Sequence, residues 1–145
     1  MSGQTVFQLL NLLVLPWWGL WLVAPRSPAA ARAAEHSAIF LALSALYALL
    51  LAAALLSGPG GGVDFDGLRS AFGHPLVFLA GWTHYLCFDL FCGAWIVREA
   101  RRLELEPRAF LLATLLAGPI GLGGFLARRA WHLRTLGQLG DTDLA

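Results

Sequence analysis

Four long apolar segments alternate with short polar ones along the chain. Each segment has the roughly 20 residues that a helix needs to cross the hydrocarbon core of a bilayer. Because backbone groups in lipid have to be hydrogen-bonded within the segment, we expect all four to be helices. The predicted spans are about Thr5–Val23, Ser37–Leu56, Pro75–Val97 and Ala109–Ala130.

Prolines and glycines mark the ends of these segments. Pro25 and Pro28 end the first, and the flexible run Ser57-Gly58-Pro59-Gly60-Gly61-Gly62 ends the second. Residues 63–74 mix acidic with aromatic side chains, which suits a short segment at the membrane interface. No internal repeat is evident. The pattern therefore predicts a single domain over residues 1–145: an all-α integral membrane four-helix bundle, up-down-up-down, with both termini on the same side.

Composition supports a membrane protein. The chain is 58% hydrophobic and 13% charged, whereas a soluble domain carries about 25% charged residues. A net charge of +1 gives no reason to expect nucleic acid. In the predicted topology six arginines lie beside the first and third loops and four on the side of the termini, a weak bias that places those loops in the cytoplasm. Without a basic n-region or a transit peptide, the sequence favours the bacterial inner membrane.

The third span contains two ionisable residues, His84 and Asp89, within THYLCFDLFCGAWIVRE. A carboxylate in hydrocarbon costs several kcal/mol unless it is paired, protonated or facing a polar cavity. An apolar setting favours the neutral carboxyl, which can donate a proton. A structural role is the alternative: a carboxyl that fixes helix register through a Tyr, Trp or backbone partner, and a histidine that bridges two helices.

Helical spacing and depth place other residues near Asp89. Gly81, Tyr85, Asp89 and Gly93 recur every four residues and share one stripe, so neighbours can approach closely there. His84 lies about 140° around the helix from Asp89, so the two cannot pair directly but can flank one cavity. Pro119 predicts a kink in the fourth span at a similar depth. The residues expected to contact a ligand in this layer are Trp17, Trp18, Tyr47, Tyr85, Pro119 and Gly121.

Other chemistry has little support in the sequence. The histidines are too scattered for a metal site, so none is expected. The run Gly118–Gly124 lacks the strand and the lysine of a phosphate loop, and no nucleophilic triad or dinucleotide fingerprint is present.

Four motifs resemble the neoxanthin-synthase-like (abscisic acid deficient 4-like) family of small four-span membrane proteins. They are Leu15-Pro16, Val23-Ala24-Pro25, the block from His84 through Asp89-Leu90-Phe91, and Gly118-Pro119-Ile120-Gly121-Leu122. The resemblance implies a role in plant xanthophyll metabolism. There violaxanthin becomes neoxanthin when an epoxide opens and the proton on C7 is lost to give an allene. That isomerisation needs an acid and a base but no redox cofactor.

Two hypotheses follow from the resemblance and the residues. In the first, the protein is an isomerase of a carotenoid or related isoprenoid lipid, with Asp89 as acid and His84 as base, or the roles exchanged. In the second, it is a non-catalytic membrane protein that binds a lipophilic pigment or scaffolds partner enzymes. The expected partners are a carotenoid-like lipid and the membrane, and self-association to a homo-oligomer is left open.

Overall fold

The computed structural model describes residues 2–58 and 62–134, and these are helical, as the sequence predicted, with no strand among them. Three residues of the predicted glycine-rich turn, 59–61, and the chain from 135 onward lie outside the described part. The helices are α1 Gly3–Val23, α2 Pro28–Glu35, α3 Ala38–Leu56, α4 Phe65–Phe72, α5 Pro75–Arg102, α6 Arg108–Ala117 and α7 Pro119–Leu133.

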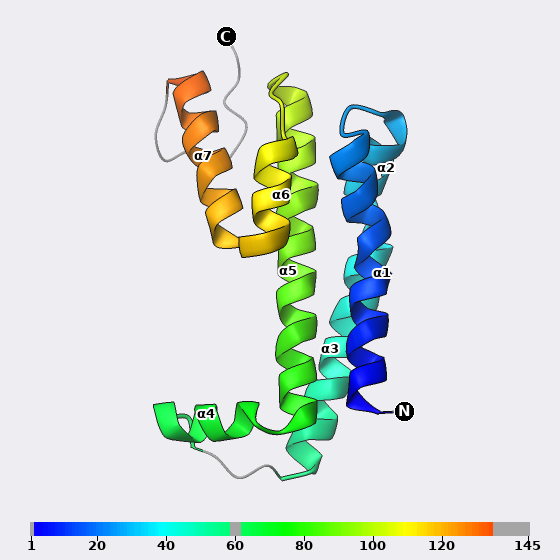
Figure 1. Ribbon diagram of the computed structural model, residues 1–145, viewed down its shortest axis with the longest axis vertical. Coiled ribbons are helices and arrows are strands. Elements are labelled where there is room, and N and C mark those ends of the chain that lie inside the picture. The colour runs from blue at the N-terminus through cyan, green and yellow to red at the C-terminus, as the bar shows by residue number, and fades with distance from the viewer. Residues whose placement is uncertain (1, 59–61, 135–145) are drawn as a thin grey trace.

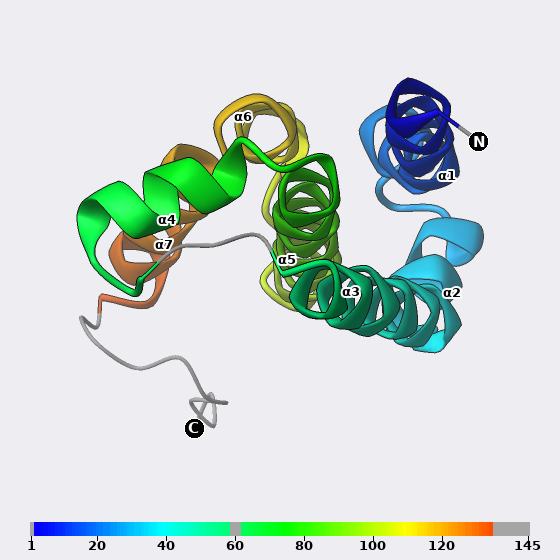
Figure 2. The ribbon, with the colours of Figure 1, turned by 90° about the horizontal axis from the view of Figure 1, so that it is seen from below.

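Three long helices make the body of the molecule (Figure 1). They are α1, α2 with α3 taken together, and α5, and each is long and apolar enough to cross a membrane. Helix α5 runs the whole length, between α1 and α3 on one side and α6 and α7 on the other (Figure 2). Its 28 residues extend about 42 Å, more than the roughly 30 Å of a hydrocarbon core.

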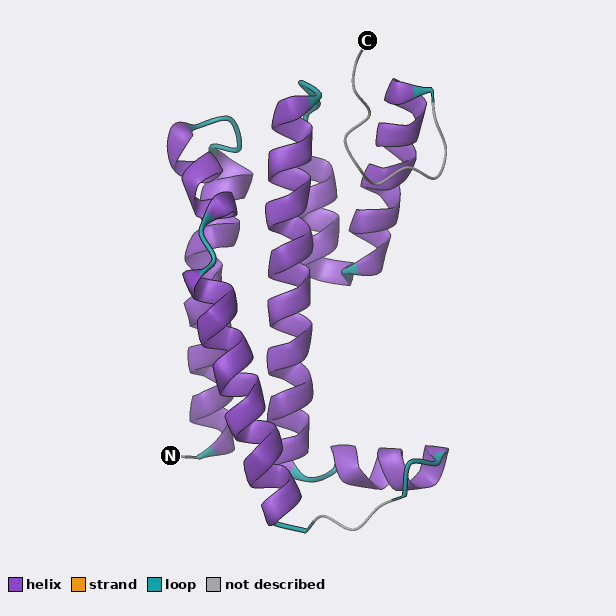
Figure 3. Cartoon of the chain, turned by 180° about the vertical axis from the view of Figure 1, so that it is seen from behind, coloured by secondary structure: helices purple, strands orange, loops and turns teal. Residues whose placement is uncertain are grey.

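Local signals explain where the helices begin. The side chain of Ser27 accepts a hydrogen bond from the Ala30 N–H, and Pro28 opens α2. The Asp64 carboxylate accepts one from the Gly67 N–H at the start of α4. Both are N-cap interactions that satisfy a free N–H of the first turn. Helix α4 then lies across the end of the molecule (Figure 3), where the mixed polar and aromatic pattern predicted a short segment.

The predicted fourth span is two helices, not one. Residues Ala109–Ala130 fall into α6 and α7, which pack against each other after the chain reverses at Gly118 (Figure 1). The break lies where Pro119 predicted a kink, but it turns the chain back. With ten residues, α6 is about 15 Å long and can reach only half of a hydrocarbon core.

The reversal changes the topology of the whole molecule. Helix α7 returns to the end at which α6 began, whereas α1 starts at the opposite end (Figure 1). The described chain, from Ser2 to Arg134, therefore begins and ends on opposite sides. The predicted up-down-up-down bundle with both termini on one side does not hold for the described residues.

A buried ionic cluster joins α7 to α5 across this hairpin. The Nε of Arg129 donates to Oε1 of Glu99 at 2.6 Å, and Arg102 donates to both carboxylate oxygens, Nε to Oε2 at 2.9 Å and Nη2 to Oε1 at 2.7 Å. Arg129 is only 3% exposed. The predicted bundle put Arg129 and Glu99 on opposite sides of the membrane, so their contact depends on the reversal at Gly118.

Candidate functional site

The Asp89 carboxyl lies against the turn of the α6–α7 hairpin. A Cβ atom built on Gly118 would come within 2.8 Å of Asp89 Oδ1, so no side chain larger than hydrogen fits between them. Gly118 is buried, has φ +35°, and donates its N–H to the carbonyl of Thr114 at 2.8 Å. The sequence expectation that the Gly-Pro run lies at the depth of Asp89 is confirmed by this contact.

One oxygen of this carboxyl has no hydrogen-bond partner. Tyr85, one turn earlier on α5, interacts with the Asp89 carboxyl through its side chain. Oδ2 of Asp89 is buried and has no hydrogen-bond partner among the described residues. Gly118 is also the N-cap of α7, and a helix N-terminus carries partial positive charge and free N–H groups. The carboxyl therefore retains an acceptor for a ligand or a proton, beside a terminus that stabilises its anion.

An apolar groove of about 240 Å³ lies close to Asp89, between α5 and α7. Cys92, in its lining, is near enough to Asp89 for the two groups to interact electrostatically. The lining is almost free of polar surface, and its residues are Phe91, Cys92, Trp95, Leu122 and Leu126. Such a groove suits a hydrocarbon chain.

Aromatic rings lead to Asp89 from the other end of α5. Phe78 and Trp82 stack with their centroids 6.3 Å apart, and Trp82 and Tyr85 follow at 5.2 Å. Phe7 of α1 packs on Trp82 at 4.9 Å. The Trp82 Nε1 is buried without a hydrogen-bond partner among the described residues. From Phe78 to Asp89 this aromatic row covers about 16 Å along the helix.

His84 lies on a different face of α5 from Asp89. It is exposed, stacks on Phe88 with centroids 4.5 Å apart, and contacts Tyr47 of α3 at 5.6 Å. His84 lines neither the apolar groove between α5 and α7 nor the groove beside Trp17. The structure thus groups Tyr47 with His84 and Tyr85 with Asp89, and does not bring the two predicted catalytic residues together.

The remaining predicted ligand contacts lie in packing interfaces or farther away. Trp18 is 2% exposed and covers Gly93, whose added Cβ would meet its ring at 2.8 Å. The approach that Gly93 was expected to allow is therefore made by an indole ring. Gly121 contacts the backbone of Thr114, which lets α7 pack tightly on α6. Pro119 is exposed at the hairpin turn, and Trp17 borders a groove with Arg32 and His36.

Sequence reasoning missed two parts of the site, the Asp89–Gly118 pair and the aromatic Trp82. It also missed the ion pair of Glu99 with Arg129 at the other end of the hairpin. A Gly-Pro step in the middle of an apolar run is a signal for a chain break and could have pointed to Gly118. Within the described ranges, no three His, Cys, Asp or Glu side chains come together as metal ligands.

The acidic Asp89 lies within the apolar helix α5 and against the break between α6 and α7. Together with three helices long and apolar enough to cross a membrane, this fits a small helical membrane protein with a buried polar site. The chain belongs to the ABA DEFICIENT 4-like family, whose family model matches residues 5–125. The family predicted from the motifs is thereby confirmed.

A curated relative supports the same assignment. The chain is 24% identical over 136 residues to the protein named ABA DEFICIENT 4, chloroplastic, of Arabidopsis thaliana. The match covers 88% of this chain and 62% of the relative, so the chain spans less than two thirds of that protein's length. No solved structure matches the chain.

Proposed function

We propose that the chain is an integral membrane protein that isomerises a carotenoid or related isoprenoid lipid, with Asp89 as the acid. The observation that carries this proposal is the Asp89 carboxyl at the hairpin turn, with Oδ2 unpartnered and an apolar groove beside it. Membership of the family supports the class of ligand, because the motifs resemble proteins of xanthophyll metabolism.

The reaction balances without a redox cofactor. The neutral Asp89 carboxyl gives its proton to the epoxide oxygen, the carbon–oxygen bond breaks, and a base removes the C7 proton as the allene forms. The N-terminus of α7 beside Gly118 stabilises the carboxylate left after the first transfer. The ring carbon that loses oxygen and C7 are adjacent, so the same carboxylate can take the second proton and return to its starting state.

The role of His84 as the base stays a prediction. His84 is five residues from Asp89 and stacks on Phe88, so a ligand held against the hairpin turn would be on another face of the helix. A single carboxyl serving in turn as acid and base needs no second residue and is the simpler arrangement.

We propose that the protein is integral to a membrane and name no particular membrane. Three apolar helices support this proposal. A bacterial inner membrane gains no support from the comparisons, since the curated relative is named as chloroplastic.

Pigment binding without catalysis is the second candidate. The exposed apolar groove and the aromatic row of Phe78, Trp82 and Tyr85 favour it, because flat rings can stack along a polyene without any proton transfer.

The decisive measurement is product formation from violaxanthin in liposomes that contain the purified protein. We expect an allenic product by chromatography and absorbance, and none above background with Asp89→Asn, which keeps the shape of the side chain but cannot release a proton at neutral pH. His84→Ala tests the predicted base, and Cys87→Ser is the matched control on the same helix.

Unchanged product formation by a folded Asp89→Asn variant would contradict the catalytic proposal. Retained pigment with no product, together with loss of that pigment in Leu122→Trp, which fills the groove, would favour the binding protein.

A further inference from the structure

A second groove, of about 600 Å³, lies at the end of α5 beside the turn from α1 to α2. Unlike the apolar groove, it has a lining that is more polar than apolar. Three arginines and one glutamate contribute to this lining, which consists of Arg26, Ala100, Arg101, Arg102 and Glu104. This composition favours an anionic ligand with several hydrogen-bond acceptors.

The hairpin concentrates positive charge at this end of the molecule. All ten basic residues are arginines, and only Arg69 of α4 lies at the opposite end (Figure 1). The other nine lie on α2, the end of α5, the start of α6, α7 and the adjoining turns, together with four glutamates. Arginines flanking spans collect on the cytoplasmic side, where the leaflet carries anionic lipids.

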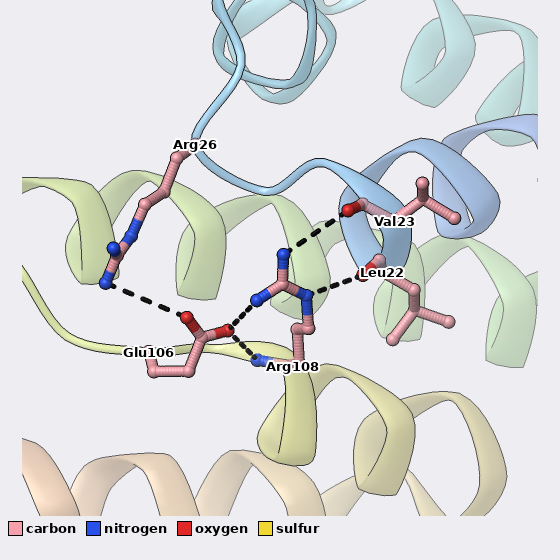
Figure 4. Close-up of polar contacts among 5 residues, drawn as sticks. All are labelled: Leu22, Val23, Arg26, Glu106 and Arg108. Atoms are coloured by element: carbon pink, nitrogen blue, oxygen red, sulfur yellow. Dashed lines mark hydrogen bonds and ion pairs between the residues drawn. The ribbon is translucent and has the colours of Figure 1, made fainter.

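Two arginines, Arg101 of the groove and Arg108 of α6, hold the backbone beside the groove in place. Nη1 of Arg101 donates to the carbonyls of Arg26 at 2.7 Å and Ser27 at 3.2 Å. Arg108 donates to the carbonyls of Leu22 at 3.0 Å and Val23 at 3.3 Å (Figure 4). The turn that carries Arg26 is therefore fixed from both sides before any ligand arrives.

The Arg26 side chain itself is weakly engaged. It is 68% exposed, and its ion pair with Glu106 measures 3.7 Å. Glu106 also accepts a hydrogen bond from Arg108 at 2.9 Å (Figure 4), so it does not depend on Arg26 for a partner. An exposed ion pair of this kind contributes little to stability, so the guanidinium can turn to a phosphate at little cost.

We propose that this groove binds the phosphate of an anionic lipid headgroup. Arg26 supplies a fork of N–H donors, and Arg101 adds the N–H groups of its guanidinium other than Nη1, which is bonded to the backbone. Arg102 adds positive potential while it remains bonded to Glu99. The groove lies where α5 changes from the apolar residues before Arg98 to a charged end, which is the level of lipid phosphates if α5 spans the bilayer.

Native mass spectrometry of the full chain in detergent tests this, with phosphatidylglycerol and phosphatidylcholine as probes. We expect the protein to retain phosphatidylglycerol in preference to phosphatidylcholine. Arg26→Gln should weaken the binding of phosphatidylglycerol about fivefold, which is the effect of removing one interfacial charge. The binding of phosphatidylcholine should be unchanged. Arg26→Lys, which keeps the charge but loses the fork, should weaken phosphatidylglycerol binding less.

Two exposed arginines outside the groove serve as matched controls. Arg134 lies at the same end of the molecule as the groove, and Arg69 lies at the opposite end. Arg69→Gln and Arg134→Gln should leave phosphatidylglycerol binding unchanged. If Arg134→Gln weakened binding as much as Arg26→Gln, a diffuse surface charge would replace the groove as the binding site. Unchanged binding by Arg26→Gln would also overturn the proposed site.

Competition with inorganic phosphate distinguishes a lipid headgroup from soluble phosphate as the source of the anion. Phosphate added at millimolar concentration against chloride of equal ionic strength should not displace phosphatidylglycerol from the wild-type protein, because it lacks the acyl chains. Complete displacement would overturn the lipid assignment and leave a site for soluble phosphate.

Discussion

At the scale of single residues, the contact that defines the candidate site is between Asp89 and Gly118. Asp89 could be singled out from the sequence because a carboxyl in an apolar helix is costly. Gly118 could not be paired with it, because 29 positions separate the two and the sequence does not state how the hairpin packs. The glycine is required twice, by its φ of +35° and by the carboxyl at 2.8 Å from the place of a Cβ.

Gly118→Ala should therefore lower the thermal unfolding midpoint in detergent, followed by tryptophan fluorescence. A side chain at positive φ costs at least about 1–2 kcal/mol, and the methyl group would also press on Asp89. Adding Asp89→Ala should recover the part of the loss that comes from this contact.

Gly123→Ala is the matched control on the same hairpin, since a Cβ there meets nothing within 4 Å. It should stabilise α7 by about 0.5–1 kcal/mol. Equal midpoints for Gly118→Ala and Gly123→Ala would rule out the strained turn.

At the scale of elements, the α6–α7 hairpin is held at both of its ends. Gly121 lets the helices touch near the turn, and Arg129 pairs with Glu99 near the other end. Hydropathy predicted an apolar segment here and did not predict a reversal, because a run of about 20 apolar residues can form one span or two shorter helices. The contacts of Gly121 and Arg129 are made in the form with two shorter helices.

Arg129→Gln should destabilise the protein by about 1.5–3 kcal/mol, the range for hydrogen bonds to charged groups. Glu99 keeps Arg102, so the loss should be smaller than for a buried charge without any partner. The unfolding midpoint in detergent measures it.

Arg128→Gln, which changes the exposed neighbour of Arg129, is the control. Its free energy of unfolding should stay within about 0.5 kcal/mol of the wild-type value. If the two variants were equally stable, the ion pair would not contribute to holding the hairpin.

At the scale of the whole molecule, the reversal decides the distribution of charge. A four-span bundle divides the arginines six to four, whereas the hairpin places nine at one end and one at the other. The weak orientation signal of the sequence becomes a strong one, and the Arg-rich end is expected to face the cytoplasm or its equivalent compartment.

Labelling of single cysteines with a membrane-impermeant maleimide tests this topology. In a background with Cys87 and Cys92 replaced by alanine, Glu104→Cys and His132→Cys should react only after permeabilisation of cells that express the protein. Ser57→Cys, at the opposite end, should react without it. If His132→Cys labelled with Ser57→Cys rather than with Glu104→Cys, the chain would have a full fourth span.

The helical class, three of the apolar spans and a carboxyl within one of them follow from the sequence alone, because helix length, hydropathy and the cost of a charge in hydrocarbon are local properties. The sequence also determined the family, through short motifs. The tertiary structure decided that the last apolar segment turns back, that Asp89 meets Gly118 while His84 faces Tyr47, and that Glu99 pairs with Arg129. These are contacts between distant positions, and their energy depends on how the helices pack, which no local pattern records.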